Sequence, residues 1–401
     1  MEYTNTVARD ASWEAFARAL NPYPLPQAVV DLDVLAVNAA QVLERAGSLP
    51  VRLGTKSLRS RAVMHRLLAS DSRFHGLLCY SADEAVFLSR GGFDDLLVAY
   101  PTVQPPAVDA VCARLREGAV ITLMVDDPVQ VRALEALGAR AGVVLPVCLD
   151  VDMSVSFPGL YFGVRRSPVN DVPGALAVWR EICACKHVRL DGVMGYEAQI
   201  SGLADAVPGQ PLRSALIRQL KRRSIPRIAA RRQAVVAALR EAGAELRFVN
   251  GGGTGSLEST RADGSVTELT AGSAFYAPLC FDHYRAFRHR PAAFFALEVT
   301  RRPAADMVTC NGGGYIASGG HPAPPQPWLP EGLSLLPDEG AGEVQTPLRG
   351  RVAGLEVGDP VLFRHAKAGE LCERFTHLLL LAEGQISEEV TTYRGDGQCF
   401  F

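Results

Sequence analysis

The sequence predicts an α/β fold, a (β/α)8 barrel of the TIM type followed by an all-β domain. Apolar runs with strand character alternate with amphipathic helical stretches over about 250 residues, a pattern typical of a parallel sheet or barrel. There are eight such runs, the number that a (β/α)8 barrel needs. After about Phe281 the helical periodicity fades, and Gly- and Pro-rich turns separate short strand-like runs. A doubly wound sheet is the structural alternative.

The expected elements follow in chain order. A short strand at 28–32 leads into a helix from about 34 to 46. Apolar runs place the eight barrel strands near residues 50–55, 74–80, 95–100, 120–125, 143–151, 188–196, 246–250 and 267–270. Amphipathic periodicity places helices between them, at 59–69, 82–90, 107–117, 128–137, 174–184 and 212–242.

The C-terminal part of the chain is expected to be β structure. Strand-like runs occur at 294–300, 307–310, 360–363 and 376–381. The proline-rich stretch 321–330 is expected to be loop, because proline lacks the N–H donor that a strand ladder needs. The chain is therefore divided into an N-terminal segment over 1–30 that packs with the β domain, a barrel over 31–281 and a β domain over 282–401.

The composition excludes several classes of function. Hydrophobic residues make up 48% of the chain and charged residues 21%, as in soluble globular proteins. A formal net charge of −2 gives no reason to expect nucleic acid or an anionic membrane as a partner. No apolar run is long enough to span a bilayer, and the N-terminus lacks the features of a signal peptide. The nine cysteines are an odd number in mostly apolar stretches, so we expect buried thiols in a cytoplasmic protein.

Lys56 is the first residue whose position suggests chemistry. Only 4 of the 41 basic residues are lysines, and Lys56 stands at the end of the apolar run 49–53, after Gly54 and Thr55. A lysine amine can lose its proton and attack a carbonyl group, whereas the arginine guanidinium stays protonated. Lys56 is therefore the candidate for a covalent bond to a carbonyl compound. The alternative is a surface residue at the mouth of a strand.

A glycine-rich loop over 250–256, Asn-Gly-Gly-Gly-Thr-Gly-Ser, is the second candidate site. It directly follows the apolar run 246–249. Successive glycines let backbone N–H groups converge on an anion, and the Thr and Ser hydroxyls add donors. Such a loop after a late barrel strand is typical of a phosphate site. A flexible turn is the alternative, and a dinucleotide fingerprint is disfavoured because the loop comes late in the chain.

Together, a reactive lysine on an early strand and a phosphate-binding loop on a late strand predict pyridoxal 5′-phosphate (PLP) as the cofactor. Lys56 would take the cofactor aldehyde, and the glycine loop would take its phosphate. The pyridine ring of PLP accepts electrons from a carbanion at the Cα atom of an amino-acid substrate. The sequence therefore predicts an enzyme that acts on an amino acid as its small-molecule substrate.

Five segments are similar in sequence to one known family. They are residues 26–38 (Pro-Gln-Ala-Val-Val-Asp-Leu-Asp-Val-Leu-Ala-Val-Asn), Lys56 after its strand, 91–101 (Gly-Gly-Phe-Asp-Asp-Leu-Leu-Val-Ala-Tyr-Pro), 250–255 and 268–273 (Glu-Leu-Thr-Ala-Gly-Ser). These segments resemble the D-threonine aldolase / D-serine dehydratase family, and the resemblance covers about residues 24–401 in order. It implies the alanine racemase-like fold of the fold type III PLP enzymes, with a PLP barrel followed by a β domain.

The resemblance also implies roles for particular residues. PLP would be bound to Lys56. The residues that would hold its phosphate are Gly252, Gly253, Thr254 and Ser273. Tyr196, in the run Gly-Tyr-Glu-Ala-Gln, would lie beside the pyridine ring, and a half-buried aromatic at a strand end is the alternative. Asp150 and Asp152 match acidic residues on a barrel strand of the family, where support of the strand end and catalysis both stay open.

The family often binds a divalent metal through a C-terminal His-x-Cys or His-x-Asp pair, and this chain departs from that pattern. Cys372 falls on the metal cysteine and Glu370 on the histidine position. His365 lies just upstream and could supply the imidazole. His, Glu and Cys together can bind zinc or manganese, so a metal site formed by these three residues is predicted. A structural histidine and a buried thiol are the alternative.

The resulting prediction is a PLP-dependent lyase that acts on a β-hydroxy-D-amino acid, by retro-aldol cleavage or by dehydration and deamination. Gly54 stands two residues before Lys56, where the family commonly has a histidine, so specificity within the family stays open. An amino-acid racemase is the main alternative, and a non-catalytic PLP-binding protein is an alternative of another class. Because two-domain members of the fold usually form the site across a dimer, a homodimer is expected.

Overall fold

The structure, a computed structural model, describes residues 4–319 and 323–400. Eight parallel strands close into a barrel in the order β10-β11-β2-β3-β4-β5-β6-β9. The strands are β2 (Val51–Gly54), β3 (Phe74–Cys79), β4 (Leu96–Val98), β5 (Ile121–Val125), β6 (Leu145–Asp150), β9 (Val188–Gly195), β10 (Phe248–Gly251) and β11 (Glu268–Ala271). Each overlaps one of the eight predicted strands, so the (β/α)8 prediction is confirmed and the doubly wound alternative is wrong.

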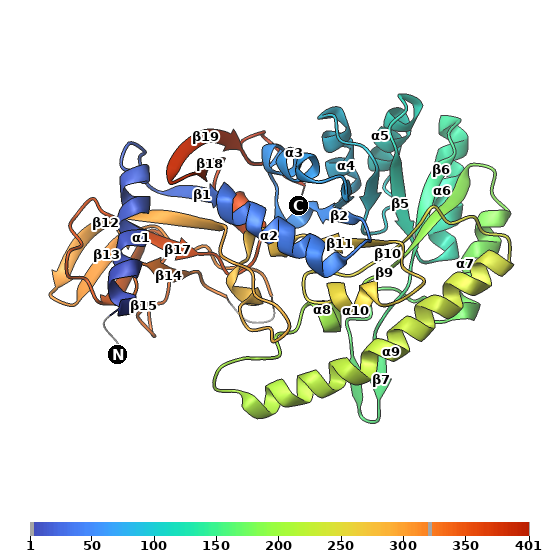
Figure 1. The fold of residues 1–401 in the computed structure, drawn as a ribbon. Coiled ribbons are helices and arrows are strands. Elements are labelled where there is room, and N and C mark those ends of the chain that lie inside the picture. Colours follow the sequence, from blue (N-terminus) through green and yellow to red (C-terminus); the bar gives the residue numbers. More distant parts are fainter. Residues whose placement is uncertain (1–3, 320–322, 401) are drawn as a thin grey trace.

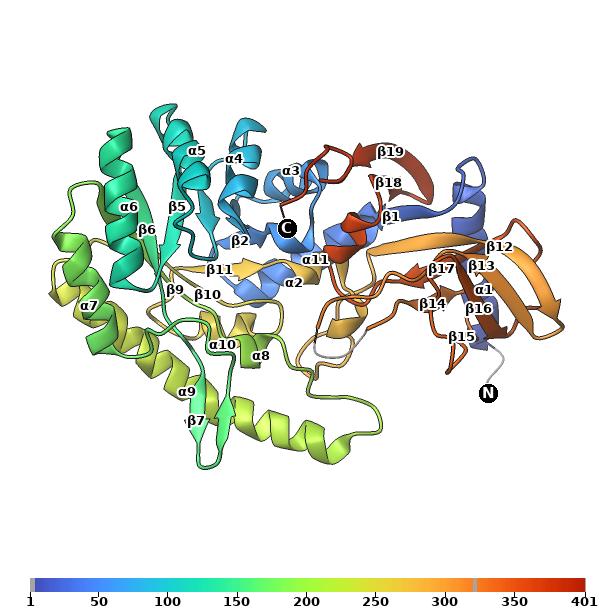
Figure 2. The same cartoon turned by 180° about the vertical axis from the view of Figure 1, so that it is seen from behind.

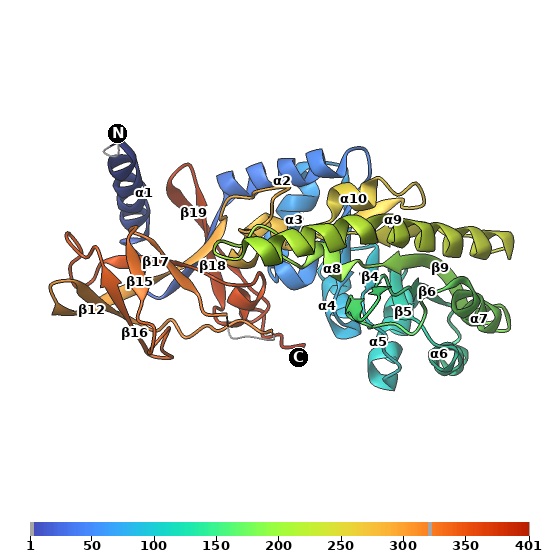
Figure 3. The same ribbon diagram turned by 90° about the horizontal axis from the view of Figure 1, so that it is seen from below.

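Helices cover the outside of the barrel (Figure 1). They are α2 (Leu32–Ala46), α3 (Arg61–Ser70), α4 (Ala82–Arg90), α5 (Pro105–Arg116), α6 (Pro128–Ala141), α7 (Val172–Cys183) and α9 (Pro211–Glu241). Polar side chains begin several of them: Asp31 accepts a hydrogen bond from the amide of Val34, and Ser81 caps α4 in the same way. The long helix α9 runs across the barrel (Figure 3).

Short elements occupy the loops of the barrel. They are the hairpin β7 (Val155–Phe157) and β8 (Leu160–Phe162), the helices α8 (Ala198–Ser201), α10 (Leu257–Arg261) and α11 (Ser273–Tyr276), and the 3-10 turns η1 (Thr55–Ser57) and η2 (Leu279–Phe281). In the parts of the chain that the structure places, no helix has the length and apolar character to cross a bilayer.

The second domain is mostly sheet and lies beside the barrel (Figures 1 and 2). Its strands are β1 (Gln27–Asp31), β12 (Ala293–Ala304), β13 (Met307–Asn311), β14 (Gln326–Leu329), β15 (Leu333–Leu335), β16 (Gln345–Gly350), β17 (Pro360–Arg364), β18 (His377–Ala382) and β19 (Gln385–Thr391). Strand β1 pairs antiparallel with β12 and parallel with β18, so an N-terminal strand stands inside a sheet of C-terminal strands. The predicted boundaries at 30/31 and 281/282 stay predictions.

A separate apolar core lies on one face of this sheet. Val29, Phe294 and Leu379 come from three neighbouring strands and are fully buried. Phe16 of helix α1 (Thr4–Leu20) packs edge-on against Phe294 with the ring centroids 5.0 Å apart. The N-terminal helix therefore covers part of the second domain.

The prediction that 321–330 is loop is wrong for residues 326–329, which form strand β14, while 320–322 lie outside the described residues. Among the strands that the structure describes, β14 pairs only with β17, and the register slips between Pro327 and Leu329. An edge strand with a bulge needs fewer N–H donors than a central strand does, so it accepts proline. The rule that proline excludes a strand holds for central strands, and it led to a wrong prediction for this edge strand.

The two domains are joined next to the end of β2. Ser60 Oγ donates to the carbonyl of Thr391, and Arg61 forms a two-bond ion pair with Asp396 at 3.0 Å. Gly369, in the segment before the 3-10 turn η3 (Glu370–Glu373), has φ of +84°. A Cβ atom on Gly369 would lie 1.7 Å from the carbonyl oxygen of Lys56, so only glycine allows this close approach. The segment 365–373 is thereby fixed against the predicted cofactor lysine.

A buried ion network links neighbouring barrel strands. The guanidinium of Arg52 on β2 is fully buried and donates two hydrogen bonds to Glu268 on β11, of 2.8 and 2.9 Å. It also contacts Asp95 at 3.1 Å. His75 on β3 lies 3.5 Å from Asp95 and 3.3 Å from Glu268. The two carboxylates raise the pKa of His75 to about 9, with the hydrogen bond that the imidazole donates to the Asp95 carboxylate as the largest cause.

Candidate active site

A cavity of about 430 Å³ lies at the junction of the barrel and the second domain. Much of its lining follows the C-terminal ends of barrel strands, which is where TIM-barrel proteins bind their ligands. The lining includes all six residues predicted to contact the cofactor: Lys56, Tyr196, Gly252, Gly253, Thr254 and Ser273. Residues 317–318, 323 and 366–368 contribute the lining from the second domain.

Lys56 enters the cavity from the turn η1 that follows strand β2. Its side chain is open to the cavity, although protein surrounds it on most sides. Burial lowers the pKa of Lys56, and the positive charges of Lys367 and Arg166 lower it further. The amine of Lys56 therefore loses its proton more readily than an ordinary lysine, as attack on a carbonyl requires.

The glycine loop forms a concave surface that a side chain would fill. Gly252 has φ of +87°, and a Cβ atom on Gly253 would lie 2.3 Å from Ser201 Oγ. The amides of Gly253 and Thr254 make no hydrogen bond within the described part of the chain. The Gly252 amide, by contrast, donates to Glu197 Oε2 at 2.9 Å. The amides of Gly253 and Thr254 are thus available to a bound phosphate. Gly252 lets the loop turn, but its amide is already bonded to Glu197 and is not available.

Hydroxyl donors complete this surface. Ser273 Oγ lies 3.1 Å from Ser57 Oγ, and both residues line the cavity. Ser57 follows Lys56 directly and was not predicted from the sequence, because a serine after a strand carries no signal of its own. The two hydroxyls and the two free amides give a donor set that fits a phosphate group.

A buried network holds the loop in place. Arg232 of helix α9 donates to Glu197 at 2.8 Å and to Asp263 at 2.6 Å. Glu197 in turn accepts from the hydroxyl of Thr260 at 2.6 Å and from the amide of Gly252. All four side chains of this network are buried. The loop conformation is therefore set before any ligand binds.

Tyr196 follows strand β9 and packs against the loop. Its ring carbon Cε2 would lie 3.0 Å from a Cβ atom on Gly253. Burial raises the pKa of Tyr196, so its phenol is neutral at physiological pH. A neutral aromatic beside the loop fits the predicted position next to a planar ring.

The far side of the cavity carries an acid and a cation. Asp150 ends strand β6, which stands four places from β2 in the eight-stranded barrel and is therefore opposite Lys56. Burial raises the pKa of Asp150 to about 7, and the charges of Asp126 and Asp152 contribute. Arg166 also lines the cavity and makes no ion pair within the described residues. No sequence motif pointed to Arg166.

The three predicted metal ligands do not form one site. In the described ranges, no group of three or more His, Cys, Asp or Glu side chains is placed to hold a metal ion. The thiol of Cys372 is buried and donates to the carbonyl of Leu58 at 3.3 Å. Glu370 accepts from the amide of Ser318 at 2.9 Å. Glu370 and Cys372 contact different parts of the chain, so the structure does not gather His365, Glu370 and Cys372 into one set of ligands, and the metal site stays a prediction.

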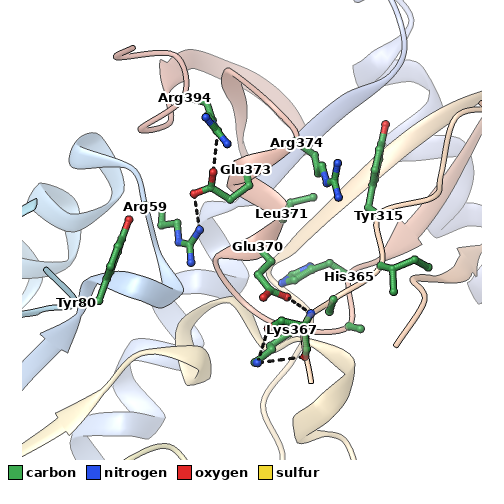
Figure 4. A pocket seen from close by; sticks show the side chains of 14 residues that line it. Arg59, Tyr80, Tyr315, His365, Lys367, Glu370, Leu371, Glu373, Arg374 and Arg394 are labelled. Carbon is green, nitrogen blue, oxygen red and sulfur yellow. Dashed lines mark hydrogen bonds and ion pairs between the residues drawn. The ribbon is translucent and has the colours of Figure 1, made fainter. Parts of the chain in front are cut away.

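His365 itself is buried without an ion pair. Neither ring nitrogen makes a hydrogen bond to another described residue. Burial lowers the pKa of His365 to about 3, so the imidazole is neutral at physiological pH. It lines a neighbouring cavity of about 590 Å³, shown in Figure 4.

This second cavity is rich in cations. Arg59 and Arg394 both pair with Glu373, the latter at 2.7 Å (Figure 4). Lys367 lines both cavities, and its Nζ atom donates to Ser318 Oγ at 2.9 Å. The two cavities therefore meet at Lys367.

The fold and the cavity define a barrel protein of the alanine racemase type. The chain belongs to the family described as alanine racemase, N-terminal domain, whose model matches residues 30–278. Two solved structures have the same fold over nearly the whole chain. D-threonine aldolase from Filomicrobium marinum has a TM-score of 0.79 at 20% identity and covers 95% of this chain and 97% of its own. D-threo-3-hydroxyaspartate dehydratase from Delftia sp. HT23 has a TM-score of 0.77 at 21% identity, covering 93% and 98%.

Two curated relatives are similar in sequence. The 3-hydroxy-D-aspartate aldolase of Paracoccus denitrificans (strain Pd 1222) is 25% identical over 261 residues, which are 65% of this chain and 62% of that enzyme. The D-threonine aldolase of an Arthrobacter species is 28% identical over 295 residues, 72% of this chain and 71% of that enzyme. A variant of a D-threo-3-hydroxyaspartate dehydratase has also been solved in a metal-free form, with a TM-score of 0.76, 21% identity, and coverage of 93% of this chain and 98% of its own.

Proposed function

We propose that the protein is a PLP-dependent lyase that acts on a β-hydroxy-D-amino acid. The observation that carries this proposal is the single cavity in which an amine of lowered pKa, Lys56, shares the lining with a donor-rich glycine loop. The names of the relatives point to β-hydroxy-D-amino acids as substrates. Retro-aldol cleavage agrees with the names of these two aldolases, and dehydration agrees with the name of the similar dehydratase structure.

The residues of the cavity fit PLP as follows. Lys56 would hold the aldehyde carbon, and the amides of Gly253 and Thr254 with the hydroxyls of Ser57 and Ser273 would hold the phosphate. When bound, the cofactor supplies an electron sink for negative charge at the substrate Cα. Lys56 can take the Cα proton once its amine is free. Arg166 offers a positive charge to an anionic group of substrate or cofactor.

A racemase is the second candidate, and one observation favours it. A racemase needs a second base on the face of the substrate opposite Lys56. Asp150 stands across the barrel from Lys56, and its pKa of about 7 suits proton transfer near neutral pH. A non-catalytic PLP-binding protein is disfavoured, because the second domain closes the cavity with residues such as Lys367. The homodimer stays a prediction that light scattering can test.

Absorbance and product analysis test the proposal. The purified protein is expected to absorb near the visible edge, and borohydride is expected to fix the cofactor on the peptide that contains Lys56. D-Threonine should give glycine and acetaldehyde, or 2-oxobutanoate and ammonia, and D-serine should give pyruvate if dehydration occurs. Label on Lys186, Lys221 or Lys367 contradicts the assignment of Lys56. The L-enantiomer as sole product would establish the racemase, and Asp150→Asn should then abolish it.

A further inference from the structure

Two of the four lysines of the chain line one cavity. Lys186 is exposed in the connection between helix α7 and strand β9. Lys221 is buried in an ion pair with Asp205, with Nζ 3.0 Å from Oδ2. The other two, Lys56 and Lys367, both face the proposed cofactor cavity. Because almost all basic residues of the chain are arginines, the presence of both Lys56 and Lys367 in one cavity suggests that their amines have a chemical role.

The position of Lys367 is fixed by its surroundings. It lies two residues before Gly369, whose contact with the Lys56 carbonyl holds this segment against η1. Its Nζ donates to the hydroxyl of Ser318 at 2.9 Å and to the carbonyl of Ser318 at 3.3 Å. Lys367 and Lys56 line the same cavity, and the charge of Lys367 is among the causes that lower the pKa of Lys56.

Lys367 is a proton donor at the edge of the cavity that the second domain forms. His365 is neutral and buried, and Cys372 is turned toward Leu58. The described residues contain no group of ligands that could place a metal ion here. A protonated amine has three N–H donors and no acceptor. It can give a proton to a substrate oxygen but cannot take one from it.

We propose that Lys367 protonates the departing β-hydroxyl of the substrate, so that the lyase runs as a dehydratase and not as an aldolase. This inference rests on the proposed function. Retro-aldol cleavage needs a base that removes the proton of the β-hydroxyl, whereas dehydration needs an acid that gives that oxygen a proton. As a protonated amine, Lys367 can donate the proton that dehydration needs. The substrate class is a β-hydroxy-D-amino acid such as D-serine or D-threonine.

The step balances in atoms and charge. The Lys56 amine takes the Cα proton, and the Cβ–O bond breaks with its electron pair on oxygen. An N–H bond of Lys367 breaks and gives its proton to that oxygen, which leaves as water. The released unsaturated amino acid tautomerises and takes up one water to give a 2-oxo acid and ammonia. Lys56 then loses a proton to solvent and Lys367 gains one, so no oxidant, reductant or metal is needed.

Exchange of the leaving group tests the proposal. For Lys367→Met, pyruvate formation from D-serine is expected to fall by about a hundredfold or more, the usual contribution of a general acid. Chloride release from β-chloro-D-alanine should stay within about threefold of wild type, because chloride leaves without a proton. Lys186→Met is the matched control and should leave both rates unchanged. Equal loss of both rates, or no loss with D-serine, overturns the proposal.

Two measurements that do not depend on turnover complete the test. In the PLP-free protein, Lys367→Met should raise the pKa of Lys56, read from the pH dependence of its acetylation by mass spectrometry. Elemental analysis should find no metal in the active protein, and exhaustive chelation should leave D-serine turnover intact. Loss of turnover on chelation would overturn the proposal, because it would show that a metal ion and not Lys367 acts on the β-hydroxyl oxygen of the substrate. Wild type without lyase activity and without label on Lys56 refutes the proposed function itself.

Discussion

At the scale of single residues, the candidate site depends on glycines whose missing side chains leave room for a ligand. Gly253 shows this most sharply, since a Cβ atom there would stand 2.3 Å from Ser201 Oγ and 3.0 Å from the Tyr196 ring. Gly253→Ala is expected to weaken binding of the cofactor by about tenfold or more, because the loop must shift by the overlap. Titration of the PLP-free protein with PLP, followed by absorbance, measures the change.

Two further variants separate local crowding from general damage. Gly264 has no atom within 4 Å of its position for a Cβ, so Gly264→Ala should bind PLP as wild type does. The double variant Gly253→Ala, Ser201→Ala removes the closest contact and should recover part of the affinity. If the double variant binds as weakly as Gly253→Ala, the Ser201 contact is not the cause.

At the scale of elements, the segment 365–373 joins the second domain to the cofactor lysine. Gly369 brings its backbone against the Lys56 carbonyl at a distance that excludes any Cβ atom. Gly369→Ala should lower the free energy of unfolding by about 1–3 kcal/mol, as overpacked sites do, and should move Lys367 away from the cavity. Urea denaturation measures the first effect, and the pKa of Lys56 reports the second.

Gly354 is the matched control for this substitution. Its φ of +86° is close to that of Gly369, and nothing lies within 4 Å of its position for a Cβ. Gly354→Ala therefore causes the same backbone strain as Gly369→Ala but no clash with a neighbouring atom. The contact with the Lys56 carbonyl contributes to stability only if Gly369→Ala lowers the free energy of unfolding clearly more than Gly354→Ala does.

At the scale of the whole molecule, the ion network around Arg52 makes stability depend on pH. The folded protein holds the proton of His75 to a pKa of about 9, whereas an unfolded histidine loses it near 6.5. The stabilisation from His75 is therefore complete below pH 6.5 and is lost as the pH rises through 9. We expect a fall of about 2 kcal/mol in the free energy of unfolding between these values, since His75 is partly exposed.

His75→Gln tests the assignment by urea denaturation at pH 6, 7.5 and 9. The variant should show a smaller fall with pH than wild type does, and the two should differ most at pH 6. His377→Gln is the control, because His377 is exposed and 4.0 Å from Glu389. Parallel pH profiles for wild type and His75→Gln would place the pH dependence elsewhere in the molecule.

The sequence alone determined the barrel and much of its site. Eight apolar runs and the intervening helices were predicted because burial on both faces leaves continuous hydrophobic strands that periodicity detects. Lys56 and the loop 250–256 were found because each follows such a strand directly, so their chemistry and their position are encoded in adjacent residues. Gly252 was predicted to bind the phosphate, but its amide donates to Glu197, a residue 55 positions away that the local sequence cannot indicate.

Only the tertiary structure decided what distant segments do together. Strand β1 pairs with strands more than 260 residues later in the chain, and strand β14 accepts Pro327 because it stands at an edge. The family resemblance placed Glu370 and Cys372 at metal-binding positions, yet in the structure the two side chains contact different partners, the Ser318 amide and the Leu58 carbonyl. Lys367 and Arg166 reach the cavity of Lys56 from loops without any motif. A sequence motif reveals residues that lie close together in the chain. A site such as this one also contains distant residues, which only the packing of the whole chain brings together.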